Sequence, residues 1–105
     1  MIGAKTLGKV ISEARKAKEM NQKELAAAIV REDGVPISPQ YLNDIEHDRR
    51  TPSADIAQQI ASVLGVHADY LLYLARKWPE DLPQSASNPE QFEKAMMAFR
   101  KALKK

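Results

Sequence analysis

Apolar residues recur along the chain three and four positions apart, the spacing that places side chains on one face of an α-helix. Leu7, Val10 and Ile11 open this pattern and predict a helix over residues 6–19. Thr6 precedes them and is suited to cap the helix, because its hydroxyl accepts a hydrogen bond from a free backbone amide. The first predicted element is therefore an amphipathic helix.

Start and stop signals of the same kind predict four further helices. Asn21 and Glu24 have the spacing of a capping box. Ser38 is followed by Pro39, which fits the first position of a helix because that position needs no N–H donor. Gly65 is placed to end a helix in the left-handed conformation. The four helices are expected over residues 21–31, 38–47, 53–65 and 68–77.

Residues 78–87 interrupt the helical pattern and are predicted to be a proline-containing linker, with Trp78 covering the base of the preceding helix. Asn88 then caps a final amphipathic helix over residues 88–105. The expected core of the helix before the linker is Tyr70, Leu71 and Leu74. The apolar stripe of the final helix comprises Phe92, Ala95, Met96, Phe99, Ala102 and Leu103. The chain is predicted to be all-α, with residues 1–77 as one domain.

Composition narrows the chemistry further. The chain has 105 residues, with 16 Lys and Arg against 14 Asp and Glu, so its net charge of +2 does not by itself indicate nucleic-acid binding. The absence of Cys excludes disulfides, Cys-ligated zinc and a thiol nucleophile. The sequence contains neither an apolar run long enough to span a membrane nor the core of a signal peptide. We therefore expect a cytoplasmic protein without metal or cofactor.

An ordered set of motifs indicates a function. The set is Arg15, Gln22-Lys23-Glu24-Leu25-Ala26, Tyr41-Leu42-Asn43-Asp44-Ile45-Glu46, Arg50-Thr51-Pro52-Ser53 and Leu64-Gly65-Val66. Over residues 6–74 the chain resembles the phage Cro/repressor type of helix-turn-helix domain, the XRE family. The resemblance implies a five-helix lambda-repressor-like domain followed by the C-terminal helix. It also implies a regulator of transcription, a repressor, that binds double-stranded DNA.

In such a domain, the recognition helix places its N-terminal residues near base edges in the major groove. Gln40 and Asn43 carry amides, which can bond N6 and N7 of adenine together. Asp44 could accept a hydrogen bond from cytosine N4, although phosphates would repel its charge. Polar residues on a helix are more often only solvated, and it is the matching motifs around these three that favour contact with bases.

Polar and basic residues around this helix are candidates to contact the DNA backbone. Gln22 and Lys23 open a helix whose free amides attract phosphate. Arg49 and Arg50 follow the recognition helix, a place where paired arginines are otherwise simply solvated. The full set of backbone candidates is Gln22, Lys23, Ser38, Tyr41, Arg49 and Arg50.

Two further expectations come from the resemblance. Arg15 and Glu46 should form a buried ion pair that fixes the angle between two helices, and both are assigned to architecture. The connection over residues 31–37 is longer than in the common motif, and its Glu32 and Asp33 would be repelled by phosphate. Either the preceding helix is longer and directs the loop away from DNA, or the domain docks differently.

The role of the last helix and the class of protein both have alternatives. Phe92, Met96, Phe99 and Leu103 would either pack on their own domain or join two copies in a homodimer. The helix could instead bind another protein, as in an antitoxin. An enzyme is the other alternative, since Asp44, His47 and Asp48 form one cluster that could hold a metal or do acid–base work, and His67 and Asp69 form another. Catalysis is disfavoured, because two His without Cys make a poor ligand set and no nucleophile motif is present.

Overall fold

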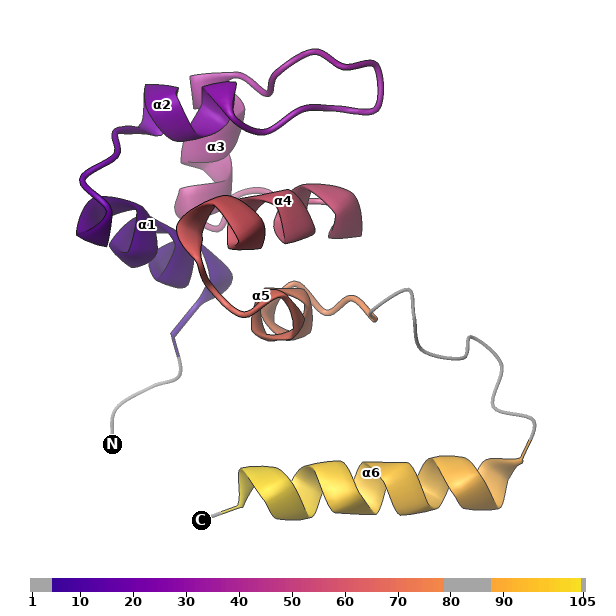
Figure 1. Ribbon diagram of the computed structural model, residues 1–105. Coiled ribbons are helices and arrows are strands. Elements are labelled where there is room, and N and C mark those ends of the chain that lie inside the picture. Colours follow the sequence, from indigo (N-terminus) through magenta and orange to yellow (C-terminus); the bar gives the residue numbers. More distant parts are fainter. Residues whose placement is uncertain (1–4, 79–87, 105) are drawn as a thin grey trace.

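The computed structural model describes residues 5–78 and 88–104. All the regular elements in these two ranges are helices, which confirms the all-α prediction (Figure 1). The helices are α1 (Leu7–Ala17), α2 (Gln22–Ala27), α3 (Pro39–Glu46), α4 (Ala54–Leu64), α5 (Ala68–Leu74) and α6 (Pro89–Leu103).

Local capping explains where the helices begin. Thr6, Ser38 and Ser53 each accept a hydrogen bond from the backbone amide three residues ahead. Asn21 forms a complete capping box with Glu24, since each side chain bonds the other residue's backbone N–H. Gly65 ends α4 with a φ of 71°, in the left-handed region that was predicted for it.

The core lies between α1, α3 and α4, with α2 packed on α3 and α5 packed on α4. Gly8 of α1 allows α3 to approach closely, because a Cβ at this position would lie 2.3 Å from the carbonyl oxygen of Glu46. The backbone amide of Gly8 also donates to Asp48 Oδ1 over 2.9 Å. The largest fully buried side chains are Ile11, Leu25, Ile29, Leu42, Ile45, Ile60, Leu71, Leu72 and Pro52.

The prediction that the second helix extends to residue 31 is wrong, since α2 ends at Ala27. Tertiary partners take up the backbone groups that would have continued it. The carbonyl of Ile29 accepts from the amide of Ile37, and the amide and carbonyl of Val30 both bond to the side chain of Gln59 on α4. Residues 28–37 instead form a long excursion, closed at its stem by a β-bridge between Val30 and Pro36 (Figure 1).

Two expectations about α5 are also wrong. Tyr70 is 43% exposed, and Trp78 is 63% exposed instead of covering the base of the helix. The buried residues are Leu71, Leu72 and Ala75, so the inward face is displaced by one position from the predicted one. Because one residue turns a helix by 100°, this displacement turns Tyr70 outward and buries Leu72.

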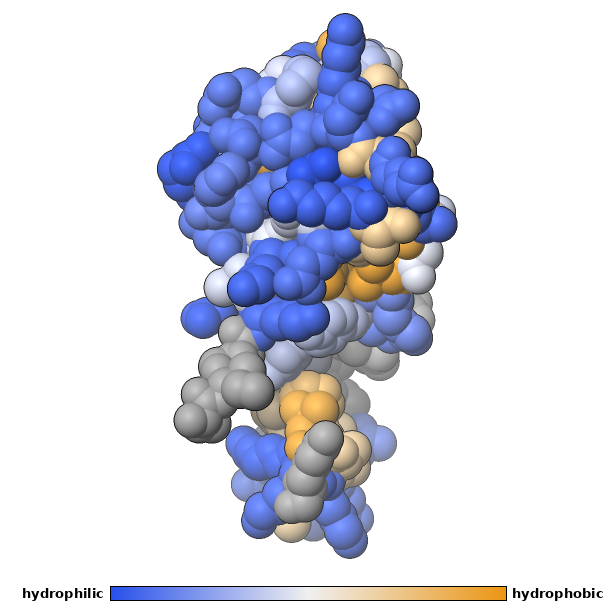
Figure 2. Space-filling model, turned by 90° about the vertical axis from the view of Figure 1, so that its left-hand side faces the viewer, coloured by the Kyte–Doolittle hydropathy of each residue, from blue (hydrophilic) through white to orange (hydrophobic). Residues whose placement is uncertain are grey.

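Helix α6 has no buried residue. Its apolar side chains are exposed apart from Met96, which is half-buried, and Figure 2 shows hydrophobic atoms gathered on this helix below a largely hydrophilic face. The ring of Phe99 lies against Tyr73 of α5, with 5.9 Å between the ring centroids. The predicted linker falls outside the described residues, apart from Trp78. Among the described helices, none combines the length and apolar character needed to cross a bilayer.

Candidate nucleic-acid interface

A buried ion pair fixes α3 against α1. Arg15 donates from Nε to Glu46 Oε2 over 2.7 Å and from Nη2 to Oε1 over 3.0 Å. Its third nitrogen, Nη1, donates to the carbonyl of Met20 over 2.8 Å. The side chains are only 10% and 3% exposed, and the hydrogen bonds to Glu46 raise the pKa of Arg15 above its ordinary value. This arrangement is the ion pair that the family resemblance implied, and it joins α1 to the helix that carries the candidate base contacts.

The outward face of α3 carries Gln40, Asn43 and Asp44. Gln40 is exposed near the N-terminus of the helix, and the other two are half-buried. Opposite them, Leu42 and Ile45 are fully buried in the core. The short helix is therefore packed on one side only, and its polar side is open to a ligand.

Asp44 is already engaged by two neighbours. Gln40 Nε2 donates to Asp44 Oδ1 over 3.1 Å, and Arg49 donates to the same oxygen from Nε and Nη2 over 3.2 and 3.1 Å. The guanidinium of Arg49 thus offsets the charge of the Asp44 carboxylate on this face of α3. Sequence reasoning placed these three residues in the candidate site but did not foresee that they bond to one another.

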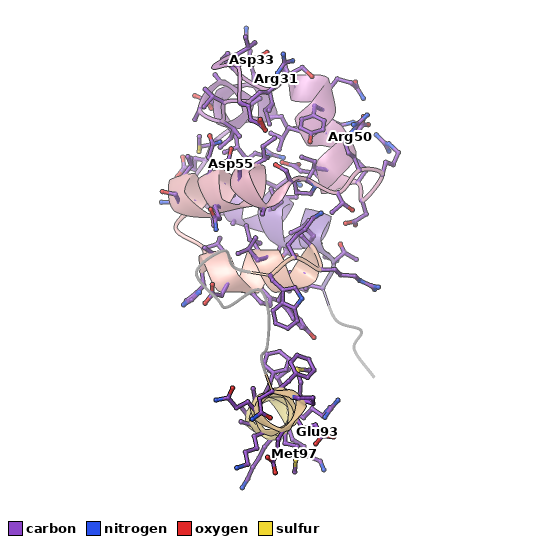
Figure 3. The ribbon with its side chains drawn as sticks, turned by 90° about the vertical axis from the view of Figure 1, so that its right-hand side faces the viewer. Arg31, Asp33, Arg50, Asp55, Glu93 and Met97 are labelled. Atoms are coloured by element: carbon purple, nitrogen blue, oxygen red, sulfur yellow. The ribbon has the colours of Figure 1, made fainter. Side chains whose placement is uncertain are left out.

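Tyr41 and Arg50 form a second contact between α3 and the segment after it. The Arg50 guanidinium carbon lies 5.0 Å from the centroid of the Tyr41 ring, a cation–π arrangement. Arg50 is exposed and projects from the domain at the α3 side, apart from Arg31 and Asp33 of the excursion (Figure 3). The stacking limits the orientations open to this cation while leaving it accessible.

The first turn of α2 contributes one exposed and one inward side chain. Lys23 is exposed, whereas Gln22 is half-buried and turns toward α3. Gln22 Nε2 donates to Asn43 Oδ1 over 3.2 Å and to Glu46 Oε1 over 3.0 Å. No local pattern signals these bonds, because they depend on how α2 crosses α3.

The residues considered for catalysis have other roles. Asp48 accepts from Gly8, His47 Nδ1 lies 2.8 Å from the carbonyl oxygen of Asn43, and His67 is the N-cap residue of α5 without a capping side-chain bond. Within residues 5–78 and 88–104, no group of three His, Asp or Glu side chains could hold a metal ion.

Comparisons with known proteins find similar sequences and a similar fold. A family model described as Helix-turn-helix covers residues 11–71, from α1 into α5. The ImmF control region 10 kDa protein of Bacillus phage phi105 is 34% identical over 71 residues, which are 68% of this chain and 72% of that protein. A chain in the solved SinR protein/SinI protein complex is similar with a TM-score of 0.52 and 27% identity, over 93% of this chain and 91% of that one.

Proposed function

The chain belongs to the helix-turn-helix family of DNA-binding transcription regulators, and from this premise we propose that it is a sequence-specific repressor acting in the cytoplasm. In this proposal, α3 enters the major groove of double-stranded DNA, Gln40 and Asn43 meet base edges, and Asp44 orients its neighbours. Lys23, Ser38, Tyr41, Arg49 and Arg50 would contact the backbone.

The observation that carries the proposal is the asymmetry of α3. One side of this helix is fully buried and tied to α1 through Arg15 and Glu46, while the other side presents amides next to two exposed arginines. Hydrogen-bonding side chains read bases, and arginines neutralise phosphates. A face that holds both kinds of group on a fixed helix is suited to sequence-specific binding.

Selection of bound duplexes from a random DNA pool tests the proposal directly. We expect enrichment of a common sequence, with affinity that falls steeply as salt rises. Enrichment of no sequence, together with no binding to any duplex at low ionic strength, would contradict it.

We further propose that residues 1–77 form the DNA-binding domain, that 78–87 link it to α6, and that α6 joins two copies. A dimer would place two recognition helices on half-sites about 34 Å apart, which suits a two-fold symmetric operator. The apolar stripe supports this role, because Phe92, Phe99 and Leu103 are exposed, Met96 is only half-buried, and one helix cannot bury the stripe alone.

Two adjacent methionines provide a matched test of the dimer. Met96 is half-buried within the stripe, whereas Met97 is 66% exposed and lies with Glu93 on the side of α6 that faces away from the other helices (Figure 3). Burying a methionine side chain in the dimer interface contributes about 1.5–3 kcal/mol to the free energy of association. Met96→Ser should therefore raise the dissociation constant of the dimer about 10- to 100-fold. Met97→Ser should leave the mass measured by light scattering unchanged. Equal effects of the two substitutions would contradict the assignment.

The second candidate function is binding of a different protein through α6, as an antitoxin binds its toxin. This candidate is supported by the similarity to a chain that was solved in a complex of two proteins, SinR and SinI. Size-exclusion chromatography of the protein alone distinguishes the homodimer from binding of a different protein. A monomer whose C-terminal helix is cut readily by proteases favours an absent partner, and a stable homodimer favours an autonomous repressor.

A further inference from the structure

Gln22 connects the outward face of α3 to the buried ion pair behind it. Its Nε2 has two hydrogens, and both are used within the protein, one toward Asn43 Oδ1 and one toward Glu46 Oε1. The side chain then offers only its oxygen to a ligand. An oxygen cannot donate to an anionic phosphate, so this geometry departs from the expected contact between Gln22 and the DNA backbone.

The orientation of this amide is set by charge. Glu46 is held by two hydrogen bonds from Arg15, and a carboxylate only accepts hydrogen bonds. The end of Gln22 that faces Glu46 must therefore be the amino end. Turning the amide over would place its oxygen against a buried negative charge.

The orientation of Asn43 follows from that of Gln22. Because the amino group of Gln22 faces Asn43, the atom it meets must be an acceptor, which is Oδ1 at 3.2 Å. Nδ2 of Asn43, with its two donor hydrogens, is then the end left to meet a base. The ion pair between α1 and α3 thus determines, through one side chain of α2, which end of an amide the recognition helix presents.

Building on the proposed DNA binding, we propose that Gln22 is a positioning residue that sets the base preference of Asn43. In the major groove, guanine presents two acceptors, adenine one acceptor and one donor, and cytosine a donor. An asparagine held with its donor end outward favours guanine and rejects cytosine. An asparagine free to turn would instead accept adenine through both of its ends.

The test uses the full-length protein and duplexes derived from selection. The base pair read by Asn43 is the one whose preference disappears in Asn43→Ala. With all four base pairs at this position, we expect the unchanged protein to favour guanine over cytosine by about 5- to 150-fold, the range of one good base contact. Gln22→Met keeps the length of the side chain but removes both hydrogen bonds. We expect it to reduce that ratio to within about threefold, since Asn43 can then turn.

A change of polarity gives a second readout. Asp at position 43 would accept from Gln22 with one oxygen and present the other outward, so Asn43→Asp should shift the preference from guanine to cytosine, whatever its effect on total affinity. Retention of the guanine preference in Asn43→Asp would overturn the proposal.

Lys23→Met is the matched control, because Lys23 is the exposed neighbour of Gln22 in the same helical turn. It should weaken binding to all four duplexes alike and leave the base ratio unchanged. If Gln22→Met gives the same uniform loss, Gln22 is a phosphate contact and the inference is overturned. Absence of binding to any duplex by the unchanged protein would instead overturn the proposed function, so the two failures are distinguishable.

Discussion

Arg15 and Glu46 meet through two parallel hydrogen bonds of 2.7 and 3.0 Å, across an interface where a single Cβ on Gly8 would collide with the backbone of α3. The close approach of α1 and α3 leaves little freedom in the crossing angle, and the side chains of the pair are only 10% and 3% exposed. The ion pair and the small residue therefore act together, since one aligns the helices and the other lets them touch.

Removing one partner of this pair should destabilise the domain. Glu46→Leu leaves a buried guanidinium without its carboxylate, and we expect the free energy of unfolding to fall by about 3–5 kcal/mol in urea denaturation. The double variant Arg15→Met with Glu46→Leu should recover most of that loss, because no buried charge remains.

The exposed pair between Asp44 and Arg49 is the control for this prediction. Asp44→Asn should change the free energy of unfolding by no more than about 1 kcal/mol, because both side chains are partly solvated. A cost of Glu46→Leu as small as that of Asp44→Asn would contradict a structural role for the buried pair.

Gln59 should hold the stem of the excursion between α2 and α3. Its Oε1 accepts from the amide of Val30 over 2.9 Å, and its Nε2 donates to the carbonyl of the same residue over 2.8 Å. Gln59→Ala removes both bonds, each of which contributes about 0.5–1.5 kcal/mol to stability. We therefore expect the stem to open locally and the amide of Val30 to exchange its hydrogen faster. Gln58→Ala on the same helix should leave that exchange rate unchanged. Equal exchange rates in the two variants would exclude the proposed clamp.

The charge of Asp33 should persist to unusually low pH. The hydrogen bond from Arg31, followed by that from the Val35 amide, lowers the pKa of Asp33 below its ordinary value. A carboxyl whose pKa is lower in the folded state stabilises the fold above its unfolded pKa, and this contribution is lost as pH falls through the folded pKa. NMR titration of the Asp33 carboxyl carbon should give a midpoint below that of an ordinary Asp. In Arg31→Gln the midpoint should rise, and an unchanged midpoint would contradict the stated cause.

Base contact and backbone contact should differ in their dependence on DNA sequence. Gln40→Ala should cost about 1–3 kcal/mol at its cognate base and relax the preference there. Arg50→Ala should weaken binding to all sequences alike and reduce the slope of log affinity against log salt by about 0.9. Titrations of cognate and altered duplexes at several salt concentrations measure both effects. Identical behaviour of the two variants across sequences would show that the roles are misassigned.

The sequence was sufficient to predict features that depend on neighbouring residues. Thr6, Asn21, Ser38 and Ser53 cap helices through bonds to amides three positions away, so their roles follow from local spacing. The left-handed end at Gly65 is of the same kind. With Asn88, which caps α6 in the same way, five of the six helix starts depend on such local chemistry.

Features that depend on tertiary partners could not be predicted. The end of α2 is determined by Gln59, which lies 29 positions from Val30. The outward turn of Tyr70 depends on how α5 meets α4, and the inward turn of Gln22 depends on how α2 crosses α3. The types of residue in the candidate site were evident from the motifs, whereas the bonds among them required the geometry.

The stem of the excursion has a practical consequence for engineering. The bridge from Val30 to Pro36 and the clamp from Gln59 fix both ends of the segment, while Gly34 at its tip has open space around the position of a Cβ. Lengthening a loop whose ends are already held together adds little entropic cost. A peptide tag or a fluorophore-bearing cysteine grafted beside Gly34 would therefore report on the domain without altering the crossing of α2 and α3.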